Sequence, residues 1–198
     1  MTVTHTNAEL ILASASPRRK YLLEQAGLRF RVVPSPFDES RVPADEPSRY
    51  ERRLAEAKAA YVAALHPASW VIGADTIVAD GHRLLGKPSS PDEARRMLVR
   101  LAGKTHQVHT GFCIRRQLDT VRYVDAVCTD VTFKELSAPE IDWYIRSGEP
   151  FDKAGAYAIQ GIGTFLVRRI NGSYSNVVGL PVCEVVEILI REGVLTLR

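Results

Sequence analysis

Apolar residues along this chain fall into short blocks whose spacing alternates between that of strands and that of helices. Continuous apolar runs bounded by turn residues are typical of buried strands, whereas apolar residues three and four positions apart are typical of one helix face. The runs predict strands over residues 9–13, 30–33, 70–79, 107–115, 122–133 and 164–170. The helical spacing, with Gly or Pro at several ends, predicts helices over residues 17–26, 48–65, 91–101, 137–146 and 182–191.

The order of these elements indicates the fold class. Helices and strands alternate in the first half of the chain, which is typical of parallel βα units. Asp80-Gly81 predicts a hairpin turn back toward Leu84, and only a hairpin-length connection separates the strands at 107–115 and 122–133. Because hairpins join antiparallel strands, the pattern predicts an α/β fold with a mixed sheet and flanking helices.

Composition narrows the class of protein. A chain of 198 residues is long enough for one core, or for two lobes that share a cleft, and 45% hydrophobic with 25% charged residues is ordinary for a soluble globular protein. The net charge of +3 is too small to indicate a nucleic-acid partner, yet it is compatible with a small polyanionic ligand. No apolar run approaches the roughly 20 residues of a membrane span, and the polar start Met1–Ala8 has no signal-peptide core. We therefore expect a cytoplasmic protein with no membrane partner.

The spacing of the cysteines and histidines gives little indication of a structural metal site. Cys113, Cys128 and Cys183 are odd in number and scattered, which favours reduced thiols over a disulfide framework. His106 and His109 lie near Cys113, but the three lie in or directly before the strand predicted at 107–115, where positions three apart point to opposite faces. Zinc is therefore disfavoured there.

The first candidate site is the turn into the helix predicted at 17–26. Ser16 is placed as its N-cap, and Arg18, Arg19 and Lys20 put three cations into its first turn. Cations there oppose the helix dipole at a cost of about 0.3–1 kcal/mol each, whereas the free N–H groups of a helix start bind phosphate. The segment is either an anion site or an ordinary capped helix with solvated basic residues.

The second candidate is Asp75, the single carboxylate in the middle of the apolar run 70–79. Burying an unpaired carboxylate costs several kcal/mol, so Asp75 must meet a cation, a donor network or water in a cleft. An ion pair with a nearby Arg is the structural alternative. Lys58 lies one turn from Leu54 and from Val62, so it borders the apolar face of its helix and either snorkels to water or reaches a phosphate.

Other segments carry weaker signals. Lys87 lies on a constrained Gly-Lys-Pro turn, and Glu39 lies in a loop after a strand, where spacing does not distinguish it from Asp38. The glycines of segment 151–163 do not follow a predicted strand in the dinucleotide-binding manner, so a loop that contacts a base or a phosphate is the better interpretation. Segment 171–181 is predicted to be a connection.

Five segments in this order, spanning about residues 10 to 190, resemble the Maf nucleotide pyrophosphatases. They are Ser14-Ala15-Ser16-Pro17-Arg18-Arg19, Gly73-Ala74-Asp75-Thr76, Gly86-Lys87-Pro88, Ala158-Ile159-Gln160-Gly161 and Ser173-Tyr174-Ser175-Asn176-Val177-Val178-Gly179-Leu180-Pro181. The resemblance implies one domain over residues 1–198, similar in fold to the inosine-triphosphate pyrophosphatases, with two lobes around a central cleft. It also implies a divalent cation such as Mg²⁺ or Mn²⁺, a homodimer, and hydrolysis of dTTP or UTP to the monophosphate and pyrophosphate, the reaction of a nucleotide diphosphatase.

The resemblance also implies roles for individual residues. Asp75 matches the family's proton acceptor. Arg18, Thr76 and Gln160 match the positions associated with substrate choice in the dTTP/UTP branch. The branch that acts on 7-methyl-GTP tends instead to carry Trp in place of Arg18 and Glu in place of Gln160. The further polar residues of the family's cleft are matched by Ser14, Arg19, Glu39, Lys58 and Lys87.

These residue types suit the cleavage of a triphosphate, which depends mostly on positioning and charge stabilisation. Lys58 and Lys87 join Asp75 and Glu39 in the expected catalytic set. The two carboxylates are the candidate metal ligands, or one of them is the base for a water molecule, and the sequence does not distinguish these roles. Gln160 carries both a donor and an acceptor, which a uracil or thymine edge requires.

Two other functions fit the same resemblance. One is a house-cleaning hydrolase that acts on modified or non-canonical nucleotides. The other is an inhibitor of septum formation or cell division that acts by binding a partner. The predicted burial of Asp75 and the lysines around it favour hydrolysis over binding alone.

Overall fold

The computed structural model describes residues 3–5, 9–43 and 45–197. The chain divides into two compact units. The first contains the described residues up to Asp75, the segment Thr110–Val127 and the residues from Gly179 onward. The second contains Thr76–His109 and Cys128–Val178. The cleft between two lobes that the family resemblance implies stays a prediction.

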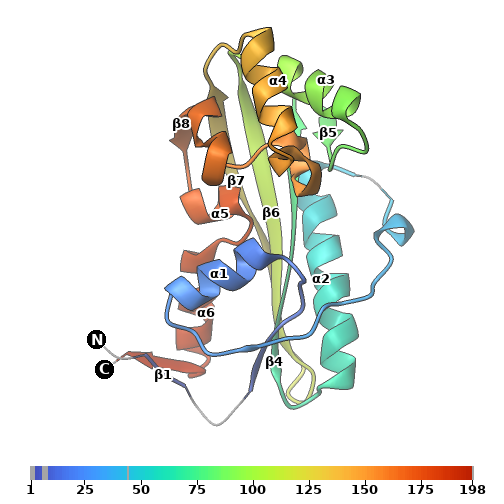
Figure 1. Ribbon diagram of the computed structural model, residues 1–198. Helices are drawn as coiled ribbons and strands as arrows, with labels where there is room; N and C mark the ends of the chain where they lie inside the picture. Colours follow the sequence, from blue (N-terminus) through green and yellow to red (C-terminus); the bar gives the residue numbers. More distant parts are fainter. Residues whose placement is uncertain (1–2, 6–8, 44, 198) are drawn as a thin grey trace. The chain divides into compact units, whose positions relative to one another are not determined.

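The described residues form a seven-stranded sheet in the order β3-β2-β4-β6-β7-β8, with β5 paired to β4 (Figure 1). Strand β2 is parallel to β3 and β4, whereas β5 is antiparallel to β4 and β8 is antiparallel to β7. The predicted mixed α/β sheet is therefore confirmed. Its strands are β2 Leu10–Leu12, β3 Arg31–Val32, β4 Trp70–Asp80, β5 Arg83–Leu85, β6 Thr105–Arg116, β7 Val121–Phe133 and β8 Val167–Asn171.

The predicted helices are present with nearly the predicted bounds. Their ends follow local chemistry: α3 begins where Ser90 Oγ accepts the N–H of Glu93 at 3.2 Å, and α4 where Glu140 accepts the N–H of Ser137 at 2.8 Å. The α-helices are α1 Pro17–Gln25, α2 Pro47–Leu65, α3 Pro91–Leu101, α4 Ala138–Arg146, α5 Tyr174–Val178 and α6 Val182–Arg191. The short 3₁₀ helices are η1 Glu39–Arg41, η2 Glu149–Asp152, η3 Ala154–Ala156 and η4 Gly161–Leu166.

In the first unit, helix α2 packs directly against the backbone of the sheet. A Cβ atom on Gly73 of β4 would lie 2.4 Å from the carbonyl oxygen of Ala55, and one on Gly111 of β6 would lie 2.3 Å from that of Glu51. Ala55 and Ala59 are fully buried at this contact, and α2 runs beside β4 (Figure 1). The small residues set how closely α2 approaches the strands, and therefore which of its side chains reach them.

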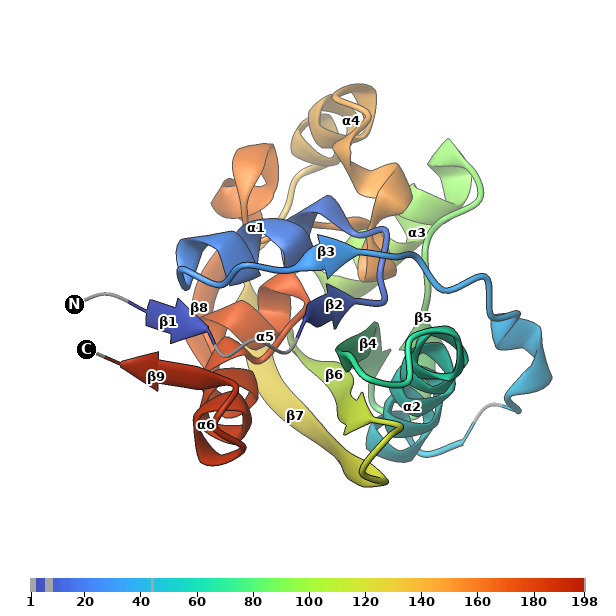
Figure 2. The same cartoon turned by 90° about the horizontal axis from the view of Figure 1, so that it is seen from below.

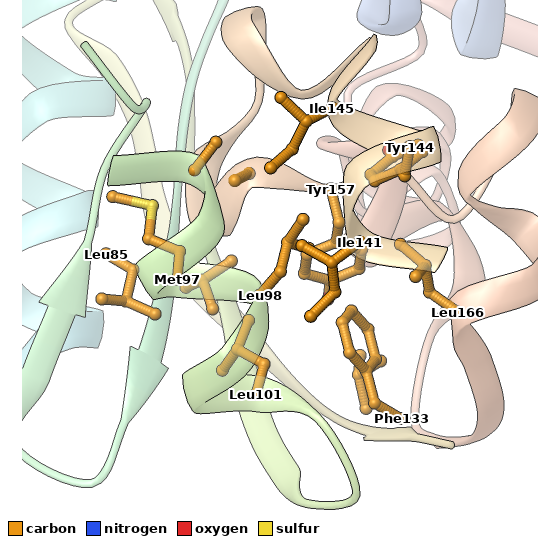
Figure 3. Close-up of a cluster of buried hydrophobic side chains, with 14 of the residues drawn as sticks. Leu85, Met97, Leu98, Leu101, Phe133, Ile141, Tyr144, Ile145, Tyr157 and Leu166 are labelled. Atoms are coloured by element: carbon orange, nitrogen blue, oxygen red, sulfur yellow. The ribbon is translucent and has the colours of Figure 1, made fainter. Parts of the chain in front are cut away.

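The second unit has its own apolar core, in which α3 and α4 pack on each other and on the sheet (Figure 3). The aromatic rings of Phe133 and Tyr157 meet edge to face at a centroid distance of 4.7 Å, inside the range favoured for such pairs. Each contributing helix offers residues at helical spacing. The helix residues are Met97, Leu98 and Leu101 of α3 with Ile141, Tyr144 and Ile145 of α4.

Some elements differ from the prediction. Strand β8 begins at Val167, not at 164, because the carboxylate of Glu149 accepts the N–H groups of Ile162 and Gly163 and holds η4 as a helical turn. Segment 171–181 was predicted as a connection but contains the short helix α5. Strand β3 is reduced to two exposed residues.

The antiparallel pair of β1 (Val3–His5) and β9 (Leu195–Leu197) was not predicted; it lies beside α6 (Figure 2). Of the polar start 1–8, on which the cytoplasmic prediction rests, only residues 3–5 are among the described residues. None of the helices in the described part of the chain combines the length and apolar character that a membrane crossing requires.

The three cysteines, all within the described residues, form no disulfide; Cys113 is buried, and Cys128 and Cys183 are exposed. His106 and His109, which point to opposite faces by the strand rule, contact different partners. Nε2 of His106 lies 2.8 Å from the hydroxyl of Tyr157, and Nε2 of His109 lies 3.7 Å from the sulfur of Cys128. Among the described residues, no three His, Cys, Asp or Glu side chains gather at one place where they could hold a metal ion.

His106 should make the fold sensitive to acid. Burial lowers the pKa of its imidazole to about 4, against an ordinary value of 6.5, although the charge of Asp80 acts in the opposite direction. Between about pH 6.5 and 4, the imidazole is protonated in the unfolded chain but stays neutral in the folded chain. Its contribution to stability is therefore full above pH 6.5 and is lost as the pH falls. The loss amounts to up to about 3 kcal/mol. Urea unfolding at pH 7.5, 6 and 5 measures it.

His106→Phe should flatten this part of the pH profile, even though it leaves the Tyr157 hydroxyl without its partner. His82→Asn, at an exposed position on the β4–β5 turn, is the matched control and should keep the wild-type slope. An unchanged slope in the His106 variant would assign the acid sensitivity to another group.

Candidate functional site

The centre of the candidate site is the ammonium group of Lys58. Its Nζ donates to Oδ1 of Asp75 and lies 2.6 Å from Oε1 of Glu39. The Lys58 side chain is 11% exposed and that of Asp75 is 16% exposed, whereas Glu39 is 55% exposed. Three of the predicted catalytic residues therefore meet at one point within the first unit.

The helix position of Lys58 explains this meeting. Lys58 follows Leu54 and precedes Val62, which are both buried, so its stem leaves α2 at the edge of the apolar face. Of the two alternatives that the sequence left open, snorkelling to water is wrong for the free protein, because the ammonium is held by carboxylates. Asp75 does meet an ion-pair partner, the ammonium group of Lys58.

Strand β4 is buried except around Asp75. The side chains from Trp70 to Ala74 are buried, and the chain becomes half-buried from Asp75 to Ile77 before burial resumes at Val78. The carboxylate therefore combines a buried ion pair with partial access to solvent. A general base needs both, because it must hold one geometry and still meet the water molecule that it deprotonates.

The three cations of the first α1 turn separate in the structure. Arg19 is buried, with Nε donating to the carbonyl of Gly179 at 2.7 Å and Nη1 donating to Ser14 Oγ at 3.0 Å. Lys20 lies 3.6 Å from Glu24, an exposed pair of small energetic value. Arg18 is half-buried.

Arg19 is therefore an anchored charge. Burial lowers its pKa, while the negative charge of Asp75 acts in the opposite direction. Ser16 is the N-cap, as predicted, but its side chain makes no capping bond. Instead, its N–H donates to Ser14 Oγ at 3.2 Å, the same oxygen that accepts from Arg19. Ser14 thus couples the start of α1 to the arginine.

Glu51 is a member of this group that the sequence reasoning missed. Its side chain is fully buried on α2, and neither carboxyl oxygen has a hydrogen-bond donor among the described residues. Burial raises the pKa of Glu51 to about 10, and the negative charge of Asp75 adds to the rise. Glu51 is therefore a neutral acid at pH 7.

A sequence signal for Glu51 did exist. Residues 51, 54, 55, 58 and 62 recur at helical spacing, so Glu51 occupies the same apolar face whose border singled out Lys58. Two ionisable residues on an apolar helix face are a local inconsistency, which is a mark of a functional or strained site.

Three predicted residues belong to the second unit. Thr76 is half-buried on β4, Lys87 is exposed between β5 and α3, and Gln160 is half-buried as the N-cap of η4. Gly155 donates its N–H to the carbonyl of Gly86 at 3.0 Å, which fixes the start of the Lys87 turn. Their convergence with the Lys58 group stays a prediction.

The segment around Asn176, which the sequence predicts to be only a connection, has a structural role. Asn176 is fully buried, and its Nδ2 donates to the carbonyl of Val108 at 3.1 Å and to Thr129 Oγ1 at 2.9 Å. These bonds hold α5 on the sheet of the second unit.

The two carboxylates at the centre fit a hard divalent cation. Glu39 and Asp75 already converge on one positive group, and carboxylate oxygens are the protein ligands that Mg²⁺ and Mn²⁺ take. Mg²⁺ is usually bound through one or two carboxylates, with substrate phosphates and water completing its shell. The pair therefore suits a cation that arrives with a triphosphate.

A family model described as "Maf-like protein" matches residues 9–192. The chain belongs to the Maf-like family. A Maf-like relative from Syntrophus aciditrophicus (strain SB), named dTTP/UTP pyrophosphatase, is 50% identical over 188 residues, which are 95% of this chain and 92% of the relative. One of the same name from Myxococcus xanthus (strain DK1622) is 52% identical over 185 residues, 93% of this chain and 92% of the relative.

Among solved structures, a HAM1 protein from Coxiella burnetii is similar to this Maf-like chain at 14% identity and a TM-score of 0.39. The match covers 64% of this chain and 73% of the HAM1 chain. The fold class of the chain rests on its own strand pairing, described above, and not on this overlap.

The neutral Glu51 of this Maf-like chain should destabilise the free protein as pH rises. Its folded pKa lies above the ordinary 4.5, so the contribution of the protonated form is full below pH 4.5 and is lost as pH rises toward 10. Glu51→Gln keeps the shape and an N–H donor without the charge. It should therefore raise the free energy of unfolding at pH 7 by up to about 3 kcal/mol, and change it little at pH 4.5.

Thermal unfolding at the two pH values tests this, with Glu24→Gln as the matched control on the exposed face of α1. A Glu51 variant that is equally or less stable than the wild type at pH 7 would mean that Glu51 is ionised and paired in the folded protein.

Proposed function

We propose that this chain is a nucleoside triphosphate pyrophosphatase that converts dTTP and UTP to the monophosphate and pyrophosphate. The observation that carries the proposal is the meeting of Lys58, Asp75 and Glu39 in a chain about half identical to relatives named for that reaction. A buried base with a paired cation supports hydrolysis over binding alone.

The reaction breaks the bond between the α and β phosphates and forms a new P–O bond to water. Asp75 accepts the proton of that water, and pyrophosphate leaves with the electron pair of the broken bond. Lys58 orients Asp75 through their ion pair and stabilises negative charge on the phosphates. Glu51, held neutral, adds no second charge beside the base.

The remaining predicted residues serve the phosphates and the metal. Arg18, Arg19 and Lys87 supply positive charge, and Ser14 with the N–H groups at the start of α1 supplies donors. A bound Mg²⁺ or Mn²⁺ would neutralise part of the triphosphate charge, and Glu39 and Asp75 are the residues that would hold it.

Base recognition is assigned to Gln160 and Thr76 of the second unit and to Arg18 of the first unit. Gln160 presents both a donor and an acceptor to the edge of uracil or thymine, and Thr76 and Arg18 shape the pocket for a pyrimidine. A cytoplasmic location, a homodimer and a free nucleotide as the substrate, not a nucleic acid, complete the proposal.

The test is pyrophosphate release across dTTP, UTP, CTP, 7-methyl-GTP, ITP and methylated pyrimidine triphosphates. We expect dTTP and UTP to lead, with Mg²⁺ or Mn²⁺ present and no activity in EDTA, because the reacting triphosphate needs its charge neutralised. The melting temperature of the free protein should not change with EDTA. Higher kcat/KM on a modified nucleotide would favour the house-cleaning function, and full activity in EDTA would contradict the metal-assisted mechanism.

Asp75→Asn should lower kcat by about 10²- to 10⁴-fold, the usual contribution of a general base, while Lys58 keeps Glu39 as its partner and the fold persists. Asp80→Asn, in the same strand but paired to Arg100, is the matched control and should keep wild-type kcat. Circular dichroism checks both folds. An Asp75 variant with more than about a tenth of wild-type kcat would rule out the base role.

Gln160→Glu should lower kcat/KM for dTTP and UTP by roughly 10- to 200-fold, the scale of losing buried polar contacts. Glutamate offers acceptors only, so it cannot satisfy an edge that presents both functions. Thymine and uracil should stay close competitors, because one methyl group discriminates by no more than that range. An equal loss on dTTP, UTP and CTP would show that Gln160 supports the phosphates or the loop instead of reading the base.

A further inference from the structure

A cavity of about 810 Å³ lies in the second unit, between β5 and α3. Its wall contains a single carboxylate, Glu93, and an unusual number of basic side chains. The basic residues are Arg83, Lys87, Arg95, Arg96, Arg100 and Lys104. The whole chain has a net charge of only +3, so positive charge is concentrated at this place.

The neighbouring acids do not neutralise this wall. Arg95 pairs with Asp142, and Nη1 of Arg100 lies 2.9 Å from Oδ2 of Asp80. Glu93 is occupied by Ser89, whose N–H donates to it at 2.7 Å. With these three acids counted, an excess of three positive charges remains. A further acid, Glu135, has its carboxylate beside Gly103 and reduces this excess to two if it is counted as well.

The positions of the basic side chains increase their mutual repulsion. Arg96 and Arg100 are one turn apart on α3, and Lys104 follows at the same spacing just beyond the end of the helix. Like charges at this spacing destabilise a helix. Arg83, Lys87 and Lys104 have no ion-pair partner among the residues that the structure describes. The energetic cost of this repulsion in the free protein is offset when an anion binds.

The cavity also has an apolar side. Val99 of α3, in the same wall, is 58% exposed, and Met97 and Leu85 line the cavity from the core side. A volume of this size is in the range of small-molecule sites, which combine apolar surface with a few polar groups. A concave, small and partly apolar site favours a small molecule over a nucleic-acid strand.

We propose that this cavity binds a small molecule that carries a polyphosphate chain, either inorganic or attached to a nucleoside. The phosphates contact Arg83, Arg96 and Lys104. When the ligand is a nucleotide, Val99 contacts its nucleoside. This proposal does not rest on the Asp75 reaction, and the variants that test it leave out Lys87, because Lys87 lines this cavity and also belongs to the proposed catalytic set.

Calorimetric titration of the full chain with pyrophosphate and with ADP, in low salt and EDTA, tests the proposal without turnover. The double variant Arg96→Glu, Lys104→Glu should weaken the binding of both ligands at least about tenfold, because two attractive charges become repulsive. The matched control is Arg168→Glu, Arg169→Glu, on exposed positions of β8 with the same change in net charge. It should keep the wild-type affinity within about twofold, and added salt should weaken wild-type binding.

Equal weakening in the two double variants would overturn the proposal, since only net charge would then matter. Tighter binding of an oligonucleotide than of pyrophosphate and ADP, lost in the Arg96 and Lys104 variant, would overturn it in favour of a nucleic-acid surface. Val99→Ser separates the two ligand sources: weaker ADP binding with unchanged pyrophosphate binding indicates a nucleotide, and no change in either indicates inorganic polyphosphate. Failure to hydrolyse dTTP would remove the proposed function and leave these binding results unaffected.

Discussion

The candidate site depends on how closely helix α2 approaches the sheet. The backbone of α2 lies where Cβ atoms on Gly73 and Gly111 would collide with it, so any larger residue at either position would push the helix outward. Packing at interior density tolerates little displacement. The contact carries Glu51 and Lys58 to the strand that bears Asp75, and so places an acid and an ammonium beside the proposed base.

Charge balance then governs the group. A buried ammonium whose partner is removed costs several kcal/mol, so Lys58 depends on Asp75 and Glu39 as much as they depend on it. Glu51 joins the same environment without adding charge, because burial and the neighbouring Asp75 keep it protonated. Arg19, anchored by Gly179, supplies a second fixed cation. The acids of this group are therefore neutral or already paired, which suits the polyanionic substrate of the proposed function.

The second unit holds a different kind of surface. Its cavity between β5 and α3 is rich in unneutralised cations and poor in acids, whereas the site in the first unit joins acids and bases in pairs. Paired groups suit proton transfer, which needs a base in a defined orientation. Unpaired cations around an apolar wall suit binding without chemistry. The two proposals thus assign the same class of ligand to two different arrangements of charge.

Much of this could be predicted from the sequence. The bounds of α3 and α6, the mixed sheet and the burial of the charges on Asp75 and Lys58 follow from neighbours within a few positions: caps, turn residues and apolar spacing. Tertiary structure alone decided that Lys58 is the partner of Asp75, that Arg19 binds a carbonyl 160 positions away, and that Glu51 is neutral. A local pattern shows that a charge is buried, but its partner and its protonation depend on which distant segments fold against it.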